Sequence, residues 1–223
     1  MTAARTPIRC PEEAESTLPL LTQTRVRFAD LQHKLVDQLG RAALDELGDE
    51  LTALAQCTID ILMRNLFERT ADVGFLATDD VLRAFCSADG PAREDMHEPF
   101  IERLKAYQSK YTVYDDIVLL DTERRVIARL DASRPVEISH DPVVAQALSQ
   151  RGHAERFGPS DLSRDASPCL LYAHRVEDAQ GRLQGALVLR FRHQDEMAQI
   201  FAGVGHDASE VVLLLLDDSD EVI

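Results

Sequence analysis

Tryptophan is absent from this chain of 223 residues, aromatic residues make up only 5% of it, and cysteine occurs four times. The four cysteines are Cys10, Cys57, Cys86 and Cys169. They form no CxxC pair and have no histidine at a metal-ligand spacing, so they indicate neither a disulfide framework nor a zinc site. Reduced thiols of a cytoplasmic protein are the expected state.

Basic residues are scarce, with 24 Lys and Arg against 39 Asp and Glu, which gives a formal net charge of −15. A field of this sign repels phosphate backbones, so nucleic acid is not an expected partner. No apolar run approaches the ~18 residues of a membrane span. Residues 1–10 are not followed by the apolar stretch of a signal peptide. The sequence therefore predicts an acidic, cytoplasmic protein.

Motifs of catalysis are also missing, because the chain contains no GxSxG, no P-loop and no HExxH sequence. The dyads His140-Asp141 and His206-Asp207 resemble those of metal phosphohydrolases, but the further histidine and aspartate partners of such a site are not evident. We therefore expect neither enzymatic activity nor a cofactor or metal.

Apolar residues do recur at steps of three and four between Glu12 and Ala77, which is the period of an amphipathic helix. Gly40 and Gly48 each cost about 1 kcal/mol in a helix interior, so a break or bend is expected near residues 39–41. The expected helices cover 15–39, 42–77, 78–86, 92–109, 143–150 and 194–201.

From Tyr114 onward the apolar period changes to that of β-structure. Short apolar runs separated by polar turn residues predict two hairpins. The expected strands cover 116–121, 126–130, 169–176 and 182–192. The polar residues 153–168 are interpreted as irregular loop.

An internal repeat relates the end of the chain to its first hairpin. Residues 213–223 align on residues 117–127 at an offset of 96, with five of eleven positions identical. Coincidence between two β-hairpins is one interpretation. The favoured one is a duplicated domain whose second copy begins near Ser209, in a chain that is a fragment of a longer protein. Alternatively, this strand pairs with another chain or folds back on the long helices.

Segments 114–121, 125–131, 170–176 and 181–191 resemble a Cache-type ligand sensor, a PAS-like module of bacterial chemoreceptors, sensor kinases and cyclic-di-nucleotide enzymes. Segment 66–79 resembles the helix that enters such sensors. The 96-residue repeat is similar to the double-Cache arrangement, in which two PAS-like lobes follow one long helix. The resemblance implies an α+β fold with long N-terminal helices, a PAS-like antiparallel β-sheet and the start of a second PAS-like lobe.

Two departures from the double-Cache sensors of amino acids concern the ligand. Their Arg-x-Trp-Tyr block is replaced by Asp141-Pro-Val-Val144, and Arg190 stands near the position of the aspartate that holds the ligand's amine. Amino-acid recognition of that type is therefore not implied. An arginine at this position favours a small anionic metabolite.

The domain organisation that we expect has four parts and a continuation. They are a flexible N-terminus (1–14), a helical stem with connecting helices (15–110), a PAS-like Cache sensor lobe (111–206), the first hairpin of a truncated second lobe (207–223), and an output domain beyond Ile223. The stem is expected to form a homodimer. The sensor would bind its ligand between the sheet and the loop of residues 131–168.

Six residues are the expected ligand contacts: Tyr114, Arg129, Asp131, Tyr172, His174 and Arg190. Arg129 and Arg190 lie on predicted strands and would form a cationic pocket if both face the concave side of the sheet. Alternatively, each faces solvent or pairs with an aspartate such as Asp131. Tyr172 and His174 share one face of their strand, which is either a pocket wall or a partly exposed sheet face.

The sequence thus favours a non-enzymatic sensor that binds a small molecule and transmits a conformational change through long helices. The alternative is a dimerisation or adaptor scaffold that binds no ligand.

Overall fold

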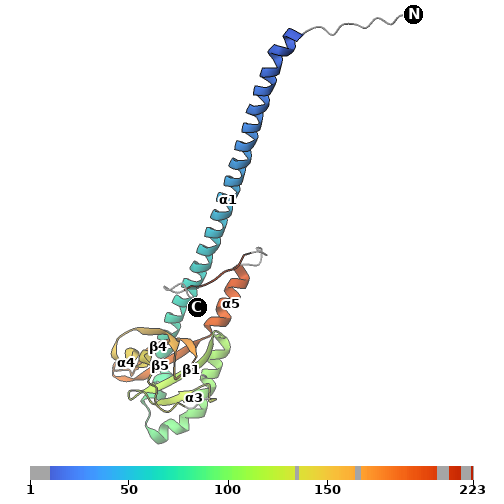
Figure 1. Ribbon diagram of the computed structural model, residues 1–223. Coiled ribbons are helices and arrows are strands. Elements are labelled where there is room, and N and C mark those ends of the chain that lie inside the picture. Colours follow the sequence, from blue (N-terminus) through green and yellow to red (C-terminus); the bar gives the residue numbers. More distant parts are fainter. Residues whose placement is uncertain (1–10, 134–135, 164–166, 205–210, 217–221, 223) are drawn as a thin grey trace, which may run out of the picture. The chain divides into compact units, whose positions relative to one another are not determined.

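The computed structural model describes residues 11–133, 136–163, 167–204, 211–216 and 222, with side chains from residue 18 onward (Figure 1). Its elements are α1 (Pro11–Ala77), α2 (Asp80–Ser87), α3 (Gly90–Lys110), β1 (Tyr114–Asp121), β2 (Val126–Arg129), α4 (Pro142–Ser149), β3 (His153–Pro159), β4 (Pro168–Glu177), β5 (Leu183–Phe191) and α5 (His193–Val204). Within these ranges, no helix combines the length and the apolar character that crossing a membrane requires.

The first helix, α1, continues without interruption for 67 residues, so the break expected near residues 39–41 is wrong. Gly40 and Gly48 keep their backbone N–H groups, and each glycine weakens the helix without removing a hydrogen bond. The helix begins at Pro11, inside the range 1–14 that was expected to be flexible. Residues 1–10 lie outside the described part of the chain.

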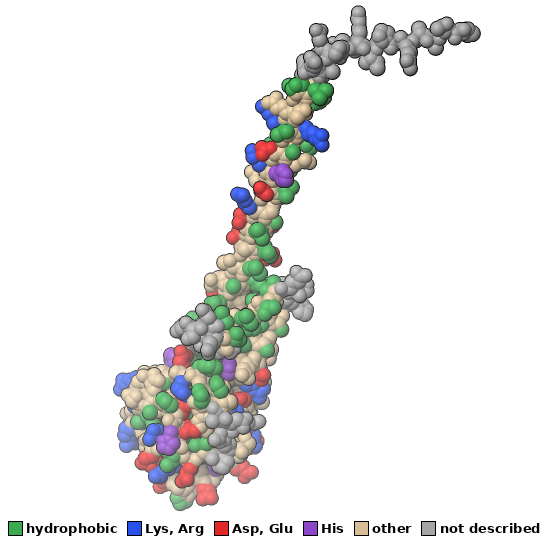
Figure 2. Space-filling view, in the orientation of Figure 1, with side chains coloured by type: hydrophobic (Ala, Val, Ile, Leu, Met, Phe, Trp, Pro, Cys, Tyr) green, Lys and Arg blue, Asp and Glu red, His purple; other side chains and the backbone are tan. Residues whose placement is uncertain are grey.

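The chain divides into two units, Met1–Gln56 and Cys57–Ile223. In the first unit, all described side chains except that of Leu54 are exposed. Apolar side chains are among them (Figure 2), including Leu31, Leu35 and Leu39 at 62%, 56% and 61% exposure. This segment of α1 therefore presents an apolar stripe that nothing described within its own unit covers.

The second unit contains a five-stranded antiparallel sheet with the strand order β2-β1-β5-β4-β3. The two predicted hairpins, β1–β2 and β4–β5, are confirmed. The prediction of a loop over 153–168 is wrong, because β3 pairs with β4 along the sheet edge. Only Ala154 of β3 is buried, so this edge strand carries almost none of the apolar signal that identifies central strands.

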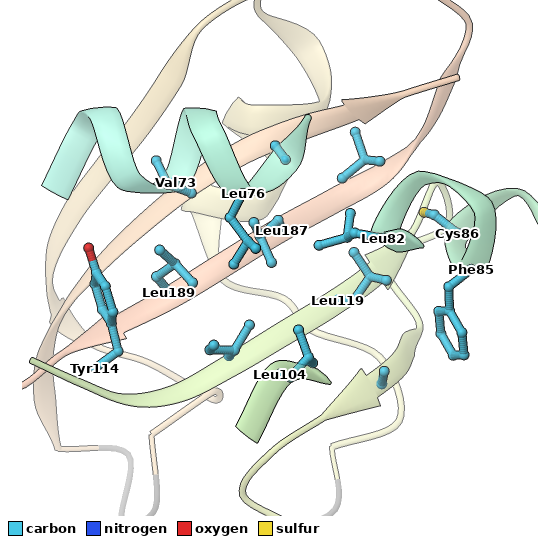
Figure 3. Close-up of a cluster of buried hydrophobic side chains, with 14 of the residues drawn as sticks. Val73, Leu76, Leu82, Phe85, Cys86, Leu104, Tyr114, Leu119, Leu187 and Leu189 are labelled. Carbon is cyan, nitrogen blue, oxygen red and sulfur yellow. The ribbon is translucent and has the colours of Figure 1, made fainter. Parts of the chain in front are cut away.

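Each face of the sheet has its own hydrophobic layer. On one side, here called the helix face, Leu119, Leu187 and Leu189 belong to a cluster with the end of α1, α2 and α3 (Figure 3). On the other side, here called the loop face, Val118 and Val188 belong to a cluster with α4 and the loop that contains Leu162. Alternation along the central strands sends successive side chains to opposite layers.

The segment after α5 is described only for residues 211–216 and for Val222, so most of the predicted hairpin at 207–223 lies outside the described residues. An isolated antiparallel bridge joins Leu216 to Val222. In the first hairpin, Leu120 pairs with Val126. These two pairs are related by the same offset of 96 as the sequence repeat. A second lobe stays a prediction, and this register agrees with it.

Candidate functional site

Two buried arginines lie on the loop face of the sheet. Arg129 ends β2 and Arg190 lies near the end of β5, with β1 between the two strands. Each arginine side chain is only 7% exposed. Asp116 on β1 is directly opposite Arg190 in the strand register and is fully buried. The strand order therefore brings two positive charges and a carboxylate together inside the protein.

Arg129 donates hydrogen bonds to a carboxylate and to a backbone carbonyl. Its Nε donates to Asp116 Oδ2 at 2.7 Å, and its Nη2 donates to the carbonyl oxygen of Leu162 at 2.6 Å. The backbone N–H of Asp131 donates to Asp116 Oδ1 at 3.0 Å. Burial raises the pKa of Asp116, and the positive charge of Arg129 opposes that shift. These contacts connect β1 and β2 to the loop that covers them.

Arg190 has a partner at the surface and another in the interior. Its Nε donates to Asp115 Oδ1 at 2.6 Å, and its Nη2 lies 3.7 Å from Asp131 Oδ2. The Asp131 side chain is 8% exposed, whereas that of Asp115 is 34% exposed. Two guanidinium groups thus face three carboxylates. Both arginines share a face, which was the condition for a cationic pocket. Each of them pairs with an aspartate, however, as the alternative interpretation had it, and the formal charge of the cluster (+2 − 3) is −1.

A pocket of about 220 Å³ opens beside Arg190, here called the Arg190 pocket. Its lining comprises Asp115, Ser163, Ser167, Pro168, Cys169, Arg190, Phe191, Arg192, His193, Gln194 and Asp195. This volume is somewhat below the ~300–1,000 Å³ of typical ligand pockets, so the pocket suits a small metabolite. The pocket thus draws on β1, β5, the start of α5 and the loop before β4.

The ionisable groups of the Arg190 pocket give it both signs of charge. Burial raises the pKa of the Cys169 thiol to about 11, so this thiol is neutral at pH 7. Burial lowers the pKa of His193, an effect that Asp115 opposes. Arg190 and Arg192 supply positive charge, while Asp115 and Asp195 supply negative charge. In the described part of the chain, no group of three or more metal-ligating side chains is placed to hold an ion.

Of the six predicted ligand contacts, only Arg190 lines the Arg190 pocket. Tyr114 and Tyr172 are buried in the cluster of the helix face. His174 accompanies Tyr172 on that face, and its ring lies 3.9 Å from the position that a Cβ on Gly74 of α1 would occupy. The six predicted residues therefore fall into two groups, with Arg129, Asp131 and Arg190 together on the loop face. Their roles in ligand binding stay predictions.

Tyr114 has its polar partner in α1. Its hydroxyl donates to Asp72 Oδ2 at 2.7 Å, and Arg69 Nη1 lies 3.3 Å from the same oxygen. The Arg69 guanidinium also lies 5.8 Å from the centre of the Tyr114 ring. Burial and the neighbouring Asp72 carboxylate raise the pKa of Tyr114, so its hydroxyl stays protonated. This group fastens the start of the sheet to the entering helix.

Sequence reasoning missed Asp115 and Asp116, although a signal for them was present. Asp116 is the third residue of β1 and directly precedes a run of four apolar residues, Ile117–Leu120. A carboxylate at a buried strand position requires a charged or hydrogen-bonding partner. Searching for that partner among the nearby arginines would have identified Arg129. No comparable local pattern in the sequence indicates that Arg69 and Asp72 contact Tyr114.

No protein-family model and no curated protein matches the sequence. Solved structures resemble the fold. The sensor domain of the V. cholerae histidine kinase DctB has a TM-score of 0.57 and 15% identity, with 78% of this chain and 64% of that chain covered. The ligand-binding domain of the Campylobacter jejuni chemoreceptor Tlp3, in complex with 4-methylisoleucine, has a TM-score of 0.56 and 12% identity, with coverage of 77% and 66%.

A third structure is the ligand-binding domain of the Pseudomonas fluorescens chemoreceptor CtaA in complex with L-serine, with a TM-score of 0.55 and 15% identity, covering 80% of this chain and 71% of that chain. The chain spans about two thirds of the length of these domains. Identities this low establish the fold alone. The chain has the mixed α+β fold of chemoreceptor and histidine-kinase sensor domains, the Cache-type fold that its sequence resembles.

Proposed function

We propose that this protein is a ligand-sensing domain of a bacterial signal-transduction protein of the chemotaxis type, and that it binds a small organic acid in the Arg190 pocket. The observation that carries the proposal is a buried arginine in the wall of an open pocket. The fold supports it, since the similar Tlp3 and CtaA domains are in complex with 4-methylisoleucine and L-serine.

In this proposal, an acid binds by replacing Asp115 in its ion pair with Arg190, because the cluster's formal charge is already −1. Asp115 contacts Arg190 through a single short bond to Nε, and its side chain is 34% exposed. A ligand carboxylate can form two parallel bonds with a guanidinium. In the proposed exchange, the ligand replaces Asp115, which turns into solvent. Asp131 and Asp116 stay in place and hold the arginine in position.

The experiment is thermal melting of the chain with acetate, pyruvate and succinate, and with matched amines. An acid that binds raises the melting temperature in a concentration-dependent way. Arg190→Gln removes the shift, whereas Asp115→Asn enlarges it because the internal competitor is gone. Arg182→Gln is the matched control, since Arg182 is an exposed arginine paired with Asp178 in the β4–β5 turn. A shift with amines and none with any acid would overturn the proposal.

The lobe would exist in two packing arrangements that differ in their affinity for the ligand. Binding would shift the population toward the arrangement with the higher affinity. The Arg190 pocket contacts β1 through Asp115 and the beginning of α5 through His193. The neighbouring residue in β1, Tyr114, is bonded to Asp72 of α1. This short path joins the pocket to the entering helix. A second lobe and an output domain beyond Ile223 complete the proposed signalling protein.

The N-terminal segment of α1 is the proposed dimerisation element. Its exposed stripe includes Leu31, Leu35 and Leu39, and a second copy of the same stripe would cover these side chains. Sedimentation of the wild type should show a dimer, and Leu35→Glu should shift it toward monomer. His33→Glu, about 160° around the helix from Leu35, is the control. A monomer at high concentration would contradict this part of the proposal.

One observation favours the alternative of an adaptor scaffold without a ligand, namely that carboxylates already pair with both buried arginines. The melting experiment separates the two functions. A scaffold shows no shift with any small molecule, and Asp115→Asn then only lowers its stability. The proposal includes no catalytic step, and a cytoplasmic location stays a prediction.

A further inference from the structure

A second pocket lies on the opposite side of the lobe, where α2 and α3 meet the end of α1. Its volume is about 290 Å³. The lining comprises Phe75, Leu76, Asp79, Leu82, Phe100, Arg103, Leu104, Ala106, Tyr107, Lys110 and Tyr111. None of these residues lines the Arg190 pocket, and this one is here called the α3 pocket.

The interior of the α3 pocket is apolar and firmly built. Leu82, Phe100 and Leu104 are 1%, 1% and 2% exposed and belong to the core of the helix face. Figure 3 shows Leu82 and Leu104 within that core. Tyr107 and Tyr111 stack with ring centroids 4.6 Å apart. Such walls favour an aromatic ring or a short alkyl chain.

The rim carries positive charge. Arg103 is paired with Asp79, which also accepts hydrogen bonds from the N–H groups of Val81 and Leu82 as the N-cap of α2. Lys110 in the last turn of α3 has no ion pair within the described part of the chain. The three rim charges, two positive and one negative, sum to +1. An anionic group is therefore the best match for this rim.

One polar group in the wall also lacks a partner. The Tyr107 hydroxyl is buried and, among the described residues, makes no hydrogen bond. Burial raises the pKa of Tyr107, so the hydroxyl is a donor and not an anion. A buried hydroxyl without a hydrogen-bond partner destabilises the fold. The charged neighbours of this hydroxyl are Asp72 and Arg69, so the charge of Lys110 at the rim is the feature that suits an acceptor oxygen of a ligand.

We propose that the α3 pocket binds a small amphiphilic anion, an aromatic or short-chain aliphatic carboxylate. The apolar body lies against Leu82, Phe100 and Leu104, and the carboxylate lies near Lys110. A volume near the lower end of the ~300–1,000 Å³ range of ligand pockets admits one ring or a short chain and excludes a peptide helix. The ligand would contact Leu76 of α1 as well as α3. The two pockets share no lining residue, so this site is separate from the Arg190 pocket.

The test uses calorimetry on the full chain with benzoate and hexanoate as probes, and with benzyl alcohol and benzylamine as neutral and cationic matches. We expect both acids to bind saturably, and more tightly than benzyl alcohol and benzylamine. Lys110→Glu weakens benzoate binding about fivefold or more through charge reversal at the rim. Lys105→Glu leaves it unchanged, because Lys105 pairs with Glu102 and does not line the pocket.

A second variant fills the pocket without touching its charges. Ala106 is an exposed pocket residue, and Ala106→Trp should abolish benzoate binding while the melting temperature stays close to that of the wild type. Arg190→Gln should leave benzoate binding intact, which separates this site from the proposed acid site. Absence of saturable benzoate and hexanoate binding overturns the proposal, as does binding that neither Lys110→Glu nor Ala106→Trp alters. A change of sedimenting mass in Ala106→Trp without acid binding also overturns it, in favour of an interface between copies.

Discussion

The hydroxyl of Tyr114 donates a 2.7 Å hydrogen bond to Oδ2 of Asp72, which lies 42 residues earlier in the chain. Tyr114 is the first residue of β1, and Asp72 lies one turn before the end of the long helix. Arg69 contributes an ion pair with the same carboxylate. The junction between the entering helix and the sheet is therefore polar and specific, within a layer that is otherwise hydrophobic.

Replacement of Tyr114 by phenylalanine should lower the free energy of unfolding by about 1–3 kcal/mol, because Asp72 loses its hydrogen bond while the ring packing is kept. Urea unfolding measures the change. Tyr111→Phe is the control, since Tyr111 is 39% exposed. Equal losses in the two variants would show that the bond to Asp72 contributes nothing.

The buried pair of Arg129 and Asp116 should be sensitive to removal of one partner. Arg129→Met leaves the fully buried Asp116 without its main countercharge, and a loss of about 3–5 kcal/mol is expected. The double variant Arg129→Met with Asp116→Leu should lose less, since no unpaired charge remains. Denaturant unfolding of both variants tests this. A double variant that is less stable than the single one would contradict the argument.

Gly185 on β5 pairs with Asp121 on β1 and lies against the β1 backbone. A Cβ at this position would be 2.0 Å from the carbonyl oxygen of Leu120 and 3.0 Å from the Cys86 sulfur. Gly185→Ala should therefore destabilise the lobe by about 3 kcal/mol or more, because a backbone atom must move. Gly90→Ala, with no atom within 4 Å, is the control. Similar melting temperatures for the two variants would be the contrary result.

The lowered pKa of His193 should make the protein less stable at acidic pH. Burial holds its pKa below the ordinary 6.5, although Asp115 opposes the shift. Below pH 6.5, His193 of the unfolded chain takes up a proton more readily than His193 of the folded chain. Protonation therefore favours the unfolded state, and the free energy of unfolding decreases as the pH falls from 6.5 toward the folded pKa. Unfolding in urea at about pH 7.5 and about pH 5.5 should show a smaller loss for His193→Gln than for the wild type.

The control for this measurement is His140→Gln, because His140 is exposed on the loop that precedes α4. Its pH dependence should match that of the wild type. The prediction fails if His193→Gln and His140→Gln lose the same stability between the two pH values.

Much of the secondary structure could be predicted from the sequence. The apolar run at 117–120 and the polar turn after it were sufficient for the β1–β2 hairpin, and Asp79 marked the start of α2. These features are local, since a strand or a cap depends on neighbouring residues. The edge strand β3 was missed because it is mostly exposed and therefore contains few apolar residues that would mark it as a strand. The continuity of α1 was missed because glycine weakens a helix without ending it.

The candidate site depended on longer-range relations. The sequence showed that Tyr172 and His174 share a face of one strand, but not that this face is the one opposite Arg190. It showed two arginines on strands, but not the carboxylates that neutralise them.

By itself, the sequence determined the helical and β-rich halves, the hairpins and the acidic charge, because these follow from periodicity and composition over short distances. Only the tertiary structure decided that β1 lies between β2 and β5. That order puts Asp116 between Arg129 and Arg190. Pairing energies between distant strands set this order, and the residues of any one strand do not encode it.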